Sequence, residues 1–288
     1  MAIRTLQERI LGRETSDGAG VRLRRSIGQA ATARLDPFLM LDEFASNDPN
    51  DYIAGFPPHP HRGFETVTYM LEGHMRHEDH LGNRGELRGG DVQWMTAARG
   101  IVHSEMPQQE RGRMHGFQLW INLPGAEKMK PASYRDIPAA EIPVATLPQG
   151  VTAKVIAGSL RTSAGADAAE TRGPIQGLST DPLIVDLVLP RDAAFDTGIP
   201  ADYTACLYVY EGSLTVGSDR RLLEWHTAGV LSAGERVVLQ AQTEGARALL
   251  LVARPLGEPV VQYGPFVMNT RAEINQAIED FSRGELSG

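Results

Sequence analysis

The chain has 288 residues, and its 28 Lys and Arg stand against 36 Asp and Glu, which gives a net charge of −8. This acidic balance repels phosphate backbones, so we expect no direct nucleic-acid partner. Apolar residues make up 42%, no apolar run is long enough to span a membrane, and the single cysteine excludes an internal disulfide. The N-terminus also lacks the apolar core of a signal peptide, so we expect a cytoplasmic protein that does not bind membranes.

Thirty glycines and 18 prolines punctuate short runs in which apolar and other residues alternate, a pattern typical of strands joined by tight turns. The run 21–28 is predicted to be a strand with Val21 and Leu23 on one face and Arg22 and Arg24 on the other. In the run 116–123, Gln118 and Trp120 share the strand face opposite to the aliphatic residues. Further strands are predicted over residues 66–71, 91–95, 183–189, 205–212, 236–241 and 248–253. The sequence therefore predicts an all-β protein.

One helix is predicted near the C-terminus, over residues 270–284. Thr270 and Glu273 form a capping-box pair, and Gly284 suits the helix end. Four apolar side chains fall on one face of this helix: Ile274, Ala277, Ile278 and Phe281. Because that face needs a cover, we expect the helix to pack on a sheet of the same chain and to clamp its two halves together.

A short internal repeat divides the chain. YMLEG (69–73) resembles YVYEG (208–212), which follows 139 residues later, and both halves are rich in predicted strands. The segment between them is rich in Pro, Ala, Gly and Ser, which suits a connection between domains. We expect three parts: an N-terminal domain, a linker with the start of the second domain, and a C-terminal domain with the helix, over residues 1–130, 131–180 and 181–288.

Histidines gather in the first half, where seven of the eight lie within a 57-residue window. His59 and His61 are two positions apart, and in an extended strand such residues point to the same side, about 7 Å apart at Cα. His103 and Glu105 repeat that spacing further along. Two adjacent strands could then direct three imidazole nitrogens and one carboxylate oxygen onto one divalent transition-metal ion. The sequence predicts such a metal site, with open positions for water or substrate.

The repeat restricts this site to one half of the chain. At the offset of 139 residues, Gly198, Pro200 and Gln242 stand in the places of the three histidines. Glycine and proline cannot bind a metal through a side chain. We therefore expect one metal ion per chain, in the first half.

These motifs resemble the cupin barrel, in which an HxH pair is followed by a carboxylate, a glycine turn and a later histidine. The longer blocks GFPPHPHRGFETVTYMLEG, GDVQWMTAARGIVHSEMP, HGFQLWINLP and QYGPFVMNTRAEI resemble the pirin family within the cupins. The resemblance implies a bicupin, with two antiparallel cupin-type β-barrels and a short C-terminal helix. It also implies an iron site in the N-terminal barrel only, held by His59, His61, His103 and Glu105.

The fourth ligand stays open between two carboxylates. A usual cupin would use Glu65, whereas the pirin resemblance implies Glu105. Strand alternation places both side chains inward, so it cannot decide between them. Fe(II) is the expected metal, with Mn, Ni, Cu and Zn as alternatives.

The resemblance implies a quercetin 2,3-dioxygenase-like oxidoreductase that cleaves flavonols with O₂. Glu105 would be its catalytic base, accepting the proton of the substrate hydroxyl. The alternative is a non-catalytic, iron-containing regulatory protein that senses redox state and acts through protein partners. The expected partners are a small aromatic substrate and O₂, and we expect a monomer.

Other residues are assigned by pattern alone. A substrate pocket is expected to be lined by Phe64, Met95, His115 and Gln118. A solvated hairpin loop is expected to contain His74, His77 and His80. An exposed strand face and the turn after it are expected to carry Arg22, Arg24 and Arg25. Cys206 is expected in the core.

Overall fold

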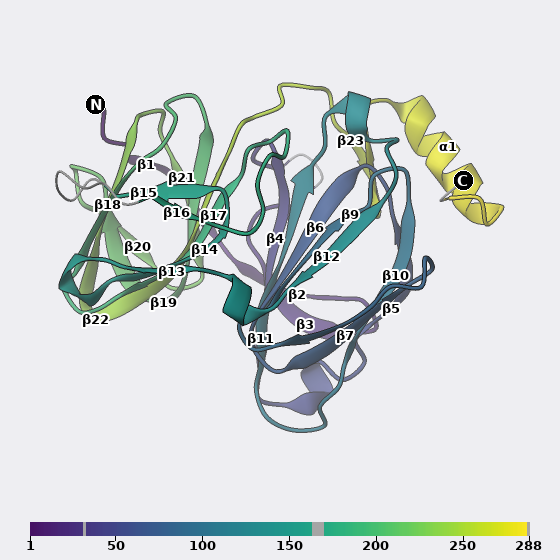
Figure 1. Cartoon of the computed structure of the whole chain (residues 1–288), viewed down its shortest axis with the longest axis horizontal. Coiled ribbons are helices and arrows are strands. Elements are labelled where there is room, and N and C mark those ends of the chain that lie inside the picture. The colour runs from purple at the N-terminus through teal and green to yellow at the C-terminus, as the bar shows by residue number, and fades with distance from the viewer. Residues whose placement is uncertain (31–32, 163–169, 287–288) are drawn as a thin grey trace. The chain divides into compact units, whose positions relative to one another are not determined.

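The computed structural model describes residues 1–30, 33–162 and 170–286, and these form two compact units. One unit combines Arg13–Ala139 with Leu256–Gly288, and the other combines Met1–Gly12 with Ala140–Pro255. Both are built from antiparallel sheets, which confirms the all-β prediction (Figure 1). These bounds differ from the expected domain boundaries at both ends of the chain. The N-terminal segment belongs to the unit formed mainly by the second half, and the C-terminal segment belongs to the unit formed mainly by the first half. We call the first the histidine unit and the second the aliphatic unit.

The histidine unit contains a seven-stranded sheet in the order β12-β9-β6-β11-β4-β3-β2 and a four-stranded sheet in the order β5-β10-β7-β8. The larger sheet comprises β2 (Arg13–Asp17), β3 (Val21–Arg25), β4 (Phe38–Ser46), β6 (Phe64–Glu72), β9 (Val92–Thr96), β11 (Met114–Asn122) and β12 (Ser133–Ile137). The smaller comprises β5 (Phe56–His61), β7 (His74–Asp79), β8 (Arg84–Arg88) and β10 (Ile101–Pro107). A hairpin of β23 (Val261–Tyr263) and β24 (Phe266–Met268) completes the unit together with the helix α1 (Arg271–Ser282).

Alternation in the sequence places the side chains of the larger sheet as predicted. Val21 and Leu23 are buried in β3. In β11, Phe117 and Leu119 are buried, whereas Gln118 on the opposite face lines a pocket. A strand exposes successive residues to opposite faces, so one sheet supplies both a hydrophobic layer and a polar wall.

The aliphatic unit is a nine-stranded sheet with the main order β1-β21-β19-β22-β17-β14-β13, in which β18 pairs with β22 and β20 with β19. Its core consists of aliphatic side chains, among them Val185, Leu187, Val209, Val237 and Leu250. The strands are β1 (Leu6–Leu11), β13 (Val144–Thr146), β14 (Thr152–Ala157), β17 (Leu183–Leu189), β18 (Ala194–Gly198), β19 (Thr204–Val216), β20 (Arg221–Glu224), β21 (Thr227–Leu231) and β22 (Arg236–Ala253), with a separate hairpin of β15 (Ser159–Arg161) and β16 (Glu170–Arg172). Cys206 is fully buried in β19, and burial raises the pKa of its thiol to about 12, so it is a core residue as predicted.

The connecting segment is more structured than expected. Within the predicted linker 131–180, β12 completes the histidine unit, and β13 and β14 begin the aliphatic unit. The chain passes from one unit to the other at Ala139–Ala140. Residues 163–169 of this segment lie outside the described part. Four 3₁₀ turns complete the described elements: Pro49–Asp51, Gly125–Glu127, Ala139–Glu141 and Pro148–Gly150.

Helix α1 packs on the histidine unit. Its predicted capping box is present, with Thr270 Oγ1 accepting from the Glu273 amide and the Glu273 carboxylate accepting from the Thr270 amide. Ile274 and Ala277 are buried in a small cluster that includes Phe266, Met268 and Leu286. The predicted apolar face is only half covered, because Ile278 and Phe281 remain exposed to 39% and 43%.

Two buried cations fix the turn that follows β5. The Lys128 ammonium donates to the carbonyl oxygens of Gly63 and Val267 at 2.6 and 3.0 Å. A side chain at Gly63, whose φ is +94°, would collide with the same Val267 carbonyl. Arg62 donates to the Leu286 carbonyl at 2.6 Å and pairs with Asp280 at 2.7 Å. The C-terminal segment therefore holds the residue next to His61.

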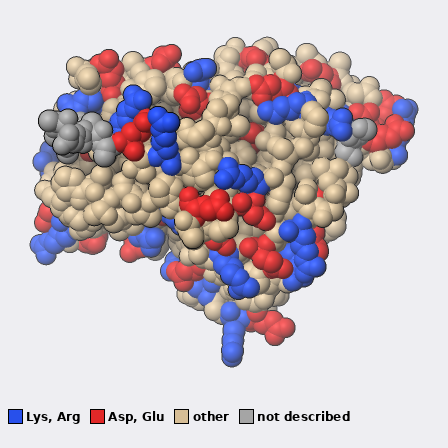
Figure 2. All heavy atoms as spheres, viewed as in Figure 1, with Lys and Arg blue, Asp and Glu red and all other residues tan. Residues whose placement is uncertain are grey.

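The surface is mixed in charge. Figure 2 shows basic and acidic side chains interspersed on the face in view, with no continuous basic stripe there. None of the helices in the described ranges has the length and apolar character needed to cross a membrane.

Candidate metal centre

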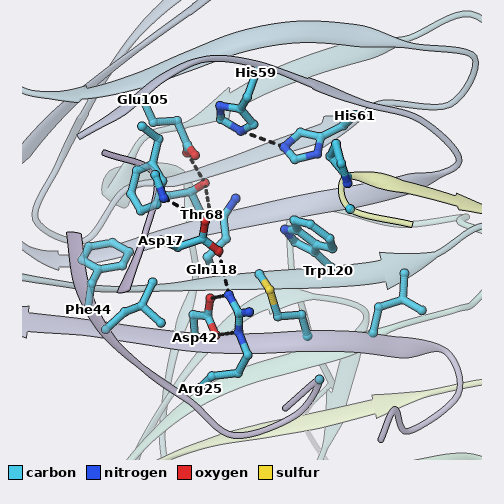
Figure 3. Close-up of a pocket in the computed structure, with 18 of the residues that line it drawn as sticks. Asp17, Arg25, Asp42, Phe44, His59, His61, Thr68, Glu105, Gln118 and Trp120 are labelled. Atoms are coloured by element: carbon cyan, nitrogen blue, oxygen red, sulfur yellow. Dashed lines mark hydrogen bonds and ion pairs between the residues drawn. The ribbon is translucent and has the colours of Figure 1, made fainter. Parts of the chain in front are cut away.

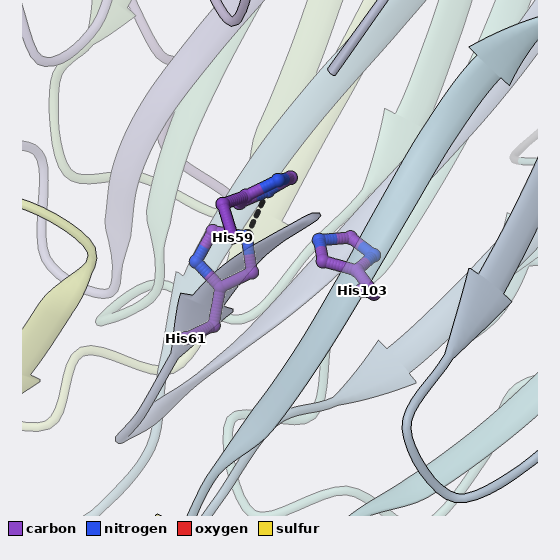
Figure 4. A group of neighbouring side chains, drawn as sticks. All are labelled: His59, His61 and His103. Atoms are coloured by element: carbon purple, nitrogen blue, oxygen red, sulfur yellow. Dashed lines mark hydrogen bonds between the residues drawn. The ribbon is translucent and has the colours of Figure 1, made fainter. Parts of the chain in front are cut away.

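The predicted histidines converge. In the register of β5 and β10, His59 lies directly opposite His103. His59, His61 and His103 each place one ring nitrogen within 4.8 Å of the others, and no other such cluster occurs among the described residues. Figure 4 shows the three rings turned toward one another from the two strands. The pairing of β5 with β10 therefore brings the three imidazoles together, as the spacing of the histidines predicted.

The three imidazoles suit a metal. His59 Nε2 and His61 Nε2 are 3.0 Å apart, and His103 Nε2 is buried without a hydrogen-bond partner. Burial holds the pKa of His61 and of His103 well below its usual value, and the neighbouring imidazoles add to that effect. Neutral imidazole offers a lone pair to a cation, so this donor set fits a divalent transition metal.

The two candidate carboxylates lie on different faces. Glu105 lines the pocket next to the histidines, and its Oε1 accepts a hydrogen bond from Thr68 Oγ1 at 2.8 Å. Glu65 is on the opposite face of β6 from Thr68 and accepts from Thr96 Oγ1 at 2.6 Å. Burial raises the pKa of Glu65. The expectation that both carboxylates point inward is therefore wrong for Glu65.

A pocket of about 820 Å³ extends from the histidines across the unit. Figure 3 shows Glu105, His59 and His61 at one end, Arg25 and Asp42 at the other, and Thr68 and Gln118 between them. Apolar wall residues include Leu23, Leu39, Phe44, Phe56, Met75 and Trp120. A pocket of this size with a few polar groups is typical of a small-molecule site.

Arg25 and Asp42 form the polar end of the pocket, which the sequence did not indicate. Arg25 donates two hydrogen bonds to Asp42, at 2.8 and 2.6 Å, and a third to Asp17 at 2.8 Å. Burial raises the pKa of Asp42 to about 6 although the Arg25 guanidinium opposes that shift. The expectation of an exposed Arg25 is thus wrong, because its side chain turns into the pocket to pair with a buried carboxylate.

The predicted pocket residues are only partly brought together. Gln118 lines the pocket, and its Oε1 lies 2.6 Å from Thr68 Oγ1. The Phe64 ring lies behind the site, 5.1 Å from the His61 ring. Met95 packs in a separate cluster with Ala97 and Ile101. His115 is on the opposite face of β11 from Gln118 and lies 2.9 Å from Glu43.

The expected solvated hairpin is correct only in part: His80 is exposed in the turn that follows β7, whereas His77 is buried within the strand. His74 and His77 lie in β7, which pairs with both β8 and β10. His77 is fully buried, and its Nδ1 is 3.2 Å from His103 Nδ1. Met75 and His77 are buried and alternate with exposed or half-buried residues, so the period of two in β7 could have revealed an inward face.

The aliphatic unit has no equivalent site among its described residues. Gly198, the counterpart of His59, is paired in β18 with Arg236 of β22. Arg236 forms an ion pair with Asp196. At the offset of 139 residues, Gln242 would be the counterpart of His103, but Arg236 is the residue that pairs with Gly198. The offset is therefore not maintained in β22. Gly198 nevertheless offers no ligand, and aliphatic side chains fill this unit.

The lowered pKa values of His61 and His103 predict how the stability of the metal-free protein depends on pH. Their pKa is lowered in the folded state, so the unfolded chain binds more protons below its own histidine pKa of about 6.5. Unfolding free energy should fall as pH drops from about 7 to 5, by up to ~1.4 kcal/mol per pH unit for each histidine. Urea unfolding at several pH values measures this, and His103→Leu should roughly halve the slope. An unchanged slope in that variant would contradict the assignment.

Comparison with known proteins agrees with this geometry. The sequence matches the Pirin family over residues 20–121 and the Pirin C-terminal cupin domain over residues 184–287. A relative from Pseudomonas aeruginosa, named "Putative quercetin 2,3-dioxygenase", is 53% identical over 96% of this chain and 95% of its own length. The crystal structure of quercetin 2,3-dioxygenase from Acinetobacter baumannii superposes with a TM-score of 0.88 at 35% identity, covering 99% of each chain.

A more distant structure shares the fold. The bacterial pirin YhhW from Escherichia coli, in complex with nickel(II), has a TM-score of 0.63 at 19% identity over 86% of this chain and 98% of its own. Matches over both halves, together with the histidine cluster in one of two cupin domains, lead to one conclusion. The chain is a member of the pirin family.

Proposed function

We propose that this chain is a metal-dependent dioxygenase that cleaves flavonols such as quercetin with O₂, using Fe(II) held by His59, His61, His103 and Glu105. The observation that carries the proposal is the cluster of three imidazoles, two of which line one end of a pocket of about 820 Å³ together with Glu105. Bound iron would supply a redox-active centre where a substrate oxygen and O₂ can meet. The relatives named for quercetin dioxygenation support this reading.

Glu105 has the position of a base. Its carboxylate faces the pocket beside His59, and Thr68 Oγ1 holds one of its oxygens at 2.8 Å. The second oxygen can accept the proton of a flavonol 3-hydroxyl, which leaves an electron-rich enolate for reaction with O₂. Both oxygen atoms of O₂ then enter the ring-opened depside, and one ring carbon leaves as carbon monoxide.

The walls of the pocket favour a flat aromatic substrate. Phe44, Phe56 and Trp120 supply apolar area, and the Trp120 ring lies 5.2 Å from that of His61. These side chains reduce the water around a bound enolate, which strengthens its electrostatic interactions and protects it from protonation. The Arg25–Asp42 pair at the far end can hydrogen-bond ring hydroxyls.

Glu105→Gln tests the proposed base. An amide has the shape of the carboxylate but is neutral and a poor base, so the variant should bind metal more weakly and lose at least about 100-fold in turnover of quercetin. O₂ uptake measured at full metal occupancy separates the two effects. Glu65→Gln is the matched control, because Glu65 faces away from the pocket, and it should retain turnover.

Two outcomes would contradict the proposal. Full turnover by Glu105→Gln would remove Glu105 as the base. A fully iron-loaded wild-type protein without flavonol-dependent O₂ uptake would instead favour the regulatory function, in which the metal's redox state controls protein contacts.

A further inference from the structure

Next to His103 lies a further buried histidine, His77, which is not one of the three clustered side chains. His77 is diagonal to His103 in the β7–β10 register, where Glu105 is its direct partner. Residues in such positions project from the same face of the sheet. The His77 ring lies 5.0 Å from that of His103, and their Nδ1 atoms are 3.2 Å apart. His77 therefore contacts the back of a predicted ligand.

His77 is itself held on its other sides. Its ring stacks on Tyr134 with centroids 4.7 Å apart and an interplanar angle of 27°. The Tyr134 hydroxyl donates to Asp136 at 2.5 Å and accepts from Gln93 at 3.0 Å. Gly85 is paired with His77 in β8, and a methyl group there would lie 1.9 Å from the Tyr134 oxygen. The glycine thus leaves the space that lets Tyr134 cover His77.

One proton lies in the hydrogen bond between the two histidines, and a metal ion bound to His103 Nε2 would determine which Nδ1 atom carries it. His103 can bind a metal through Nε2 only if its neutral ring carries the proton on Nδ1. His103 Nδ1 then donates and His77 Nδ1 accepts. A neutral His77 must carry its own proton on Nε2, which lies 3.6 Å from the buried Asp79 carboxylate. The opposite arrangement would put a proton on His103 Nε2 and block the ligand.

We propose that His77, oriented by its stacking on Tyr134, is a positioning residue that selects the metal-binding tautomer of His103 and fixes its ring. The proposal rests on the metal centre of the proposed function but not on any activity with flavonols. Partners of this kind orient metal ligands, and their removal costs about 10–100-fold in metal affinity.

The test uses the full-length metal-free protein and cobalt(II), with affinity measured by competition against a chromogenic chelator. His77→Leu removes the acceptor and should weaken cobalt(II) binding about 10–100-fold. His77→Asn restores an acceptor oxygen where Nδ1 stood and should recover most of that affinity. His77→Gln is similarly polar but places its amide one bond further out, so it should remain weak.

The matched control is His115→Leu, which removes a buried histidine on the other face of β11. It should keep the wild-type affinity for cobalt(II). The visible absorption spectrum gives a second readout, because His77→Leu should alter the cobalt(II) bands and His77→Asn should restore them. A purely structural role of His77 would not produce that pattern.

The outcomes are distinct. Wild-type affinity in both His77→Leu and His77→Gln would overturn the proposal, and so would equal weakening in His77→Asn and His77→Gln. If His77→Leu fails to fold, the comparison of the Asn and Gln variants decides alone. A wild-type protein that binds no cobalt(II) would refute the metal centre of the proposed function instead.

Discussion

His103→Ala should leave the purified protein without metal and without flavonol-dependent O₂ uptake, whereas the wild type should hold one ion per chain. The variant removes one of three nitrogen donors and the only one on β10. Loss of a direct ligand should cost more than the ~10–100-fold in metal affinity that follows loss of an outer partner. Metal content after dialysis, determined by elemental analysis, measures the effect.

His115→Ala is the control for this experiment. His115 is buried to a similar degree, but it lies 2.9 Å from Glu43 on the other face of the sheet. This variant should lose stability and keep its metal. Full metal occupancy in His103→Ala, or two ions per wild-type chain, would contradict the site.

Removal of residues 271–288 should destabilise the histidine unit and reduce its metal content. The deletion leaves Arg62, whose side chain is 3% exposed, without Asp280 and without the Leu286 carbonyl. Asp280 is partly exposed, so the loss is smaller than for a fully buried ion pair, and we expect the melting temperature to fall by several degrees. Because Arg62 directly follows His61, the turn that positions this ligand should loosen as well. Calorimetry and metal analysis of the truncated protein measure both effects.

Two single substitutions in α1 distinguish the loss of buried packing from the loss of chain length in the truncated protein. Ile274 is buried under α1, and Ile274→Ala should cost ~2–5 kcal/mol. Ile278 is 39% exposed, so Ile278→Ala should change stability little. Unchanged melting and metal content in the truncated protein would show that α1 is dispensable for the metal centre.

The strand-rich fold and the pair formed by His59 and His61 could be predicted because each depends on local rules, whereas His103 joins this pair only through the pairing of β5 with β10. Alternation in a strand determines which residues share a face, and the spacing of His59 and His61 places both rings on one side. The capping box of α1 depends only on Thr270 and Glu273, and it formed as predicted.

The errors concern partners distant in the sequence. Arg25 is paired with Asp42 on the adjacent strand β4, and the buried position of His77 depends on its pairing with β10. Glu65 was misplaced because alternation specifies which residues share a face but not which face is interior. Likewise, Arg62 and Leu286 are 224 positions apart, and no local pattern links them.

Flavonol cleavage itself is tested most directly by measuring carbon monoxide release together with O₂ uptake when quercetin is added to the iron-loaded protein. One carbon monoxide should be released per O₂ consumed, and both signals should be lost in the metal-free protein and in His103→Ala. Uptake of O₂ without carbon monoxide, or equal rates with and without metal, would contradict the proposed flavonol cleavage.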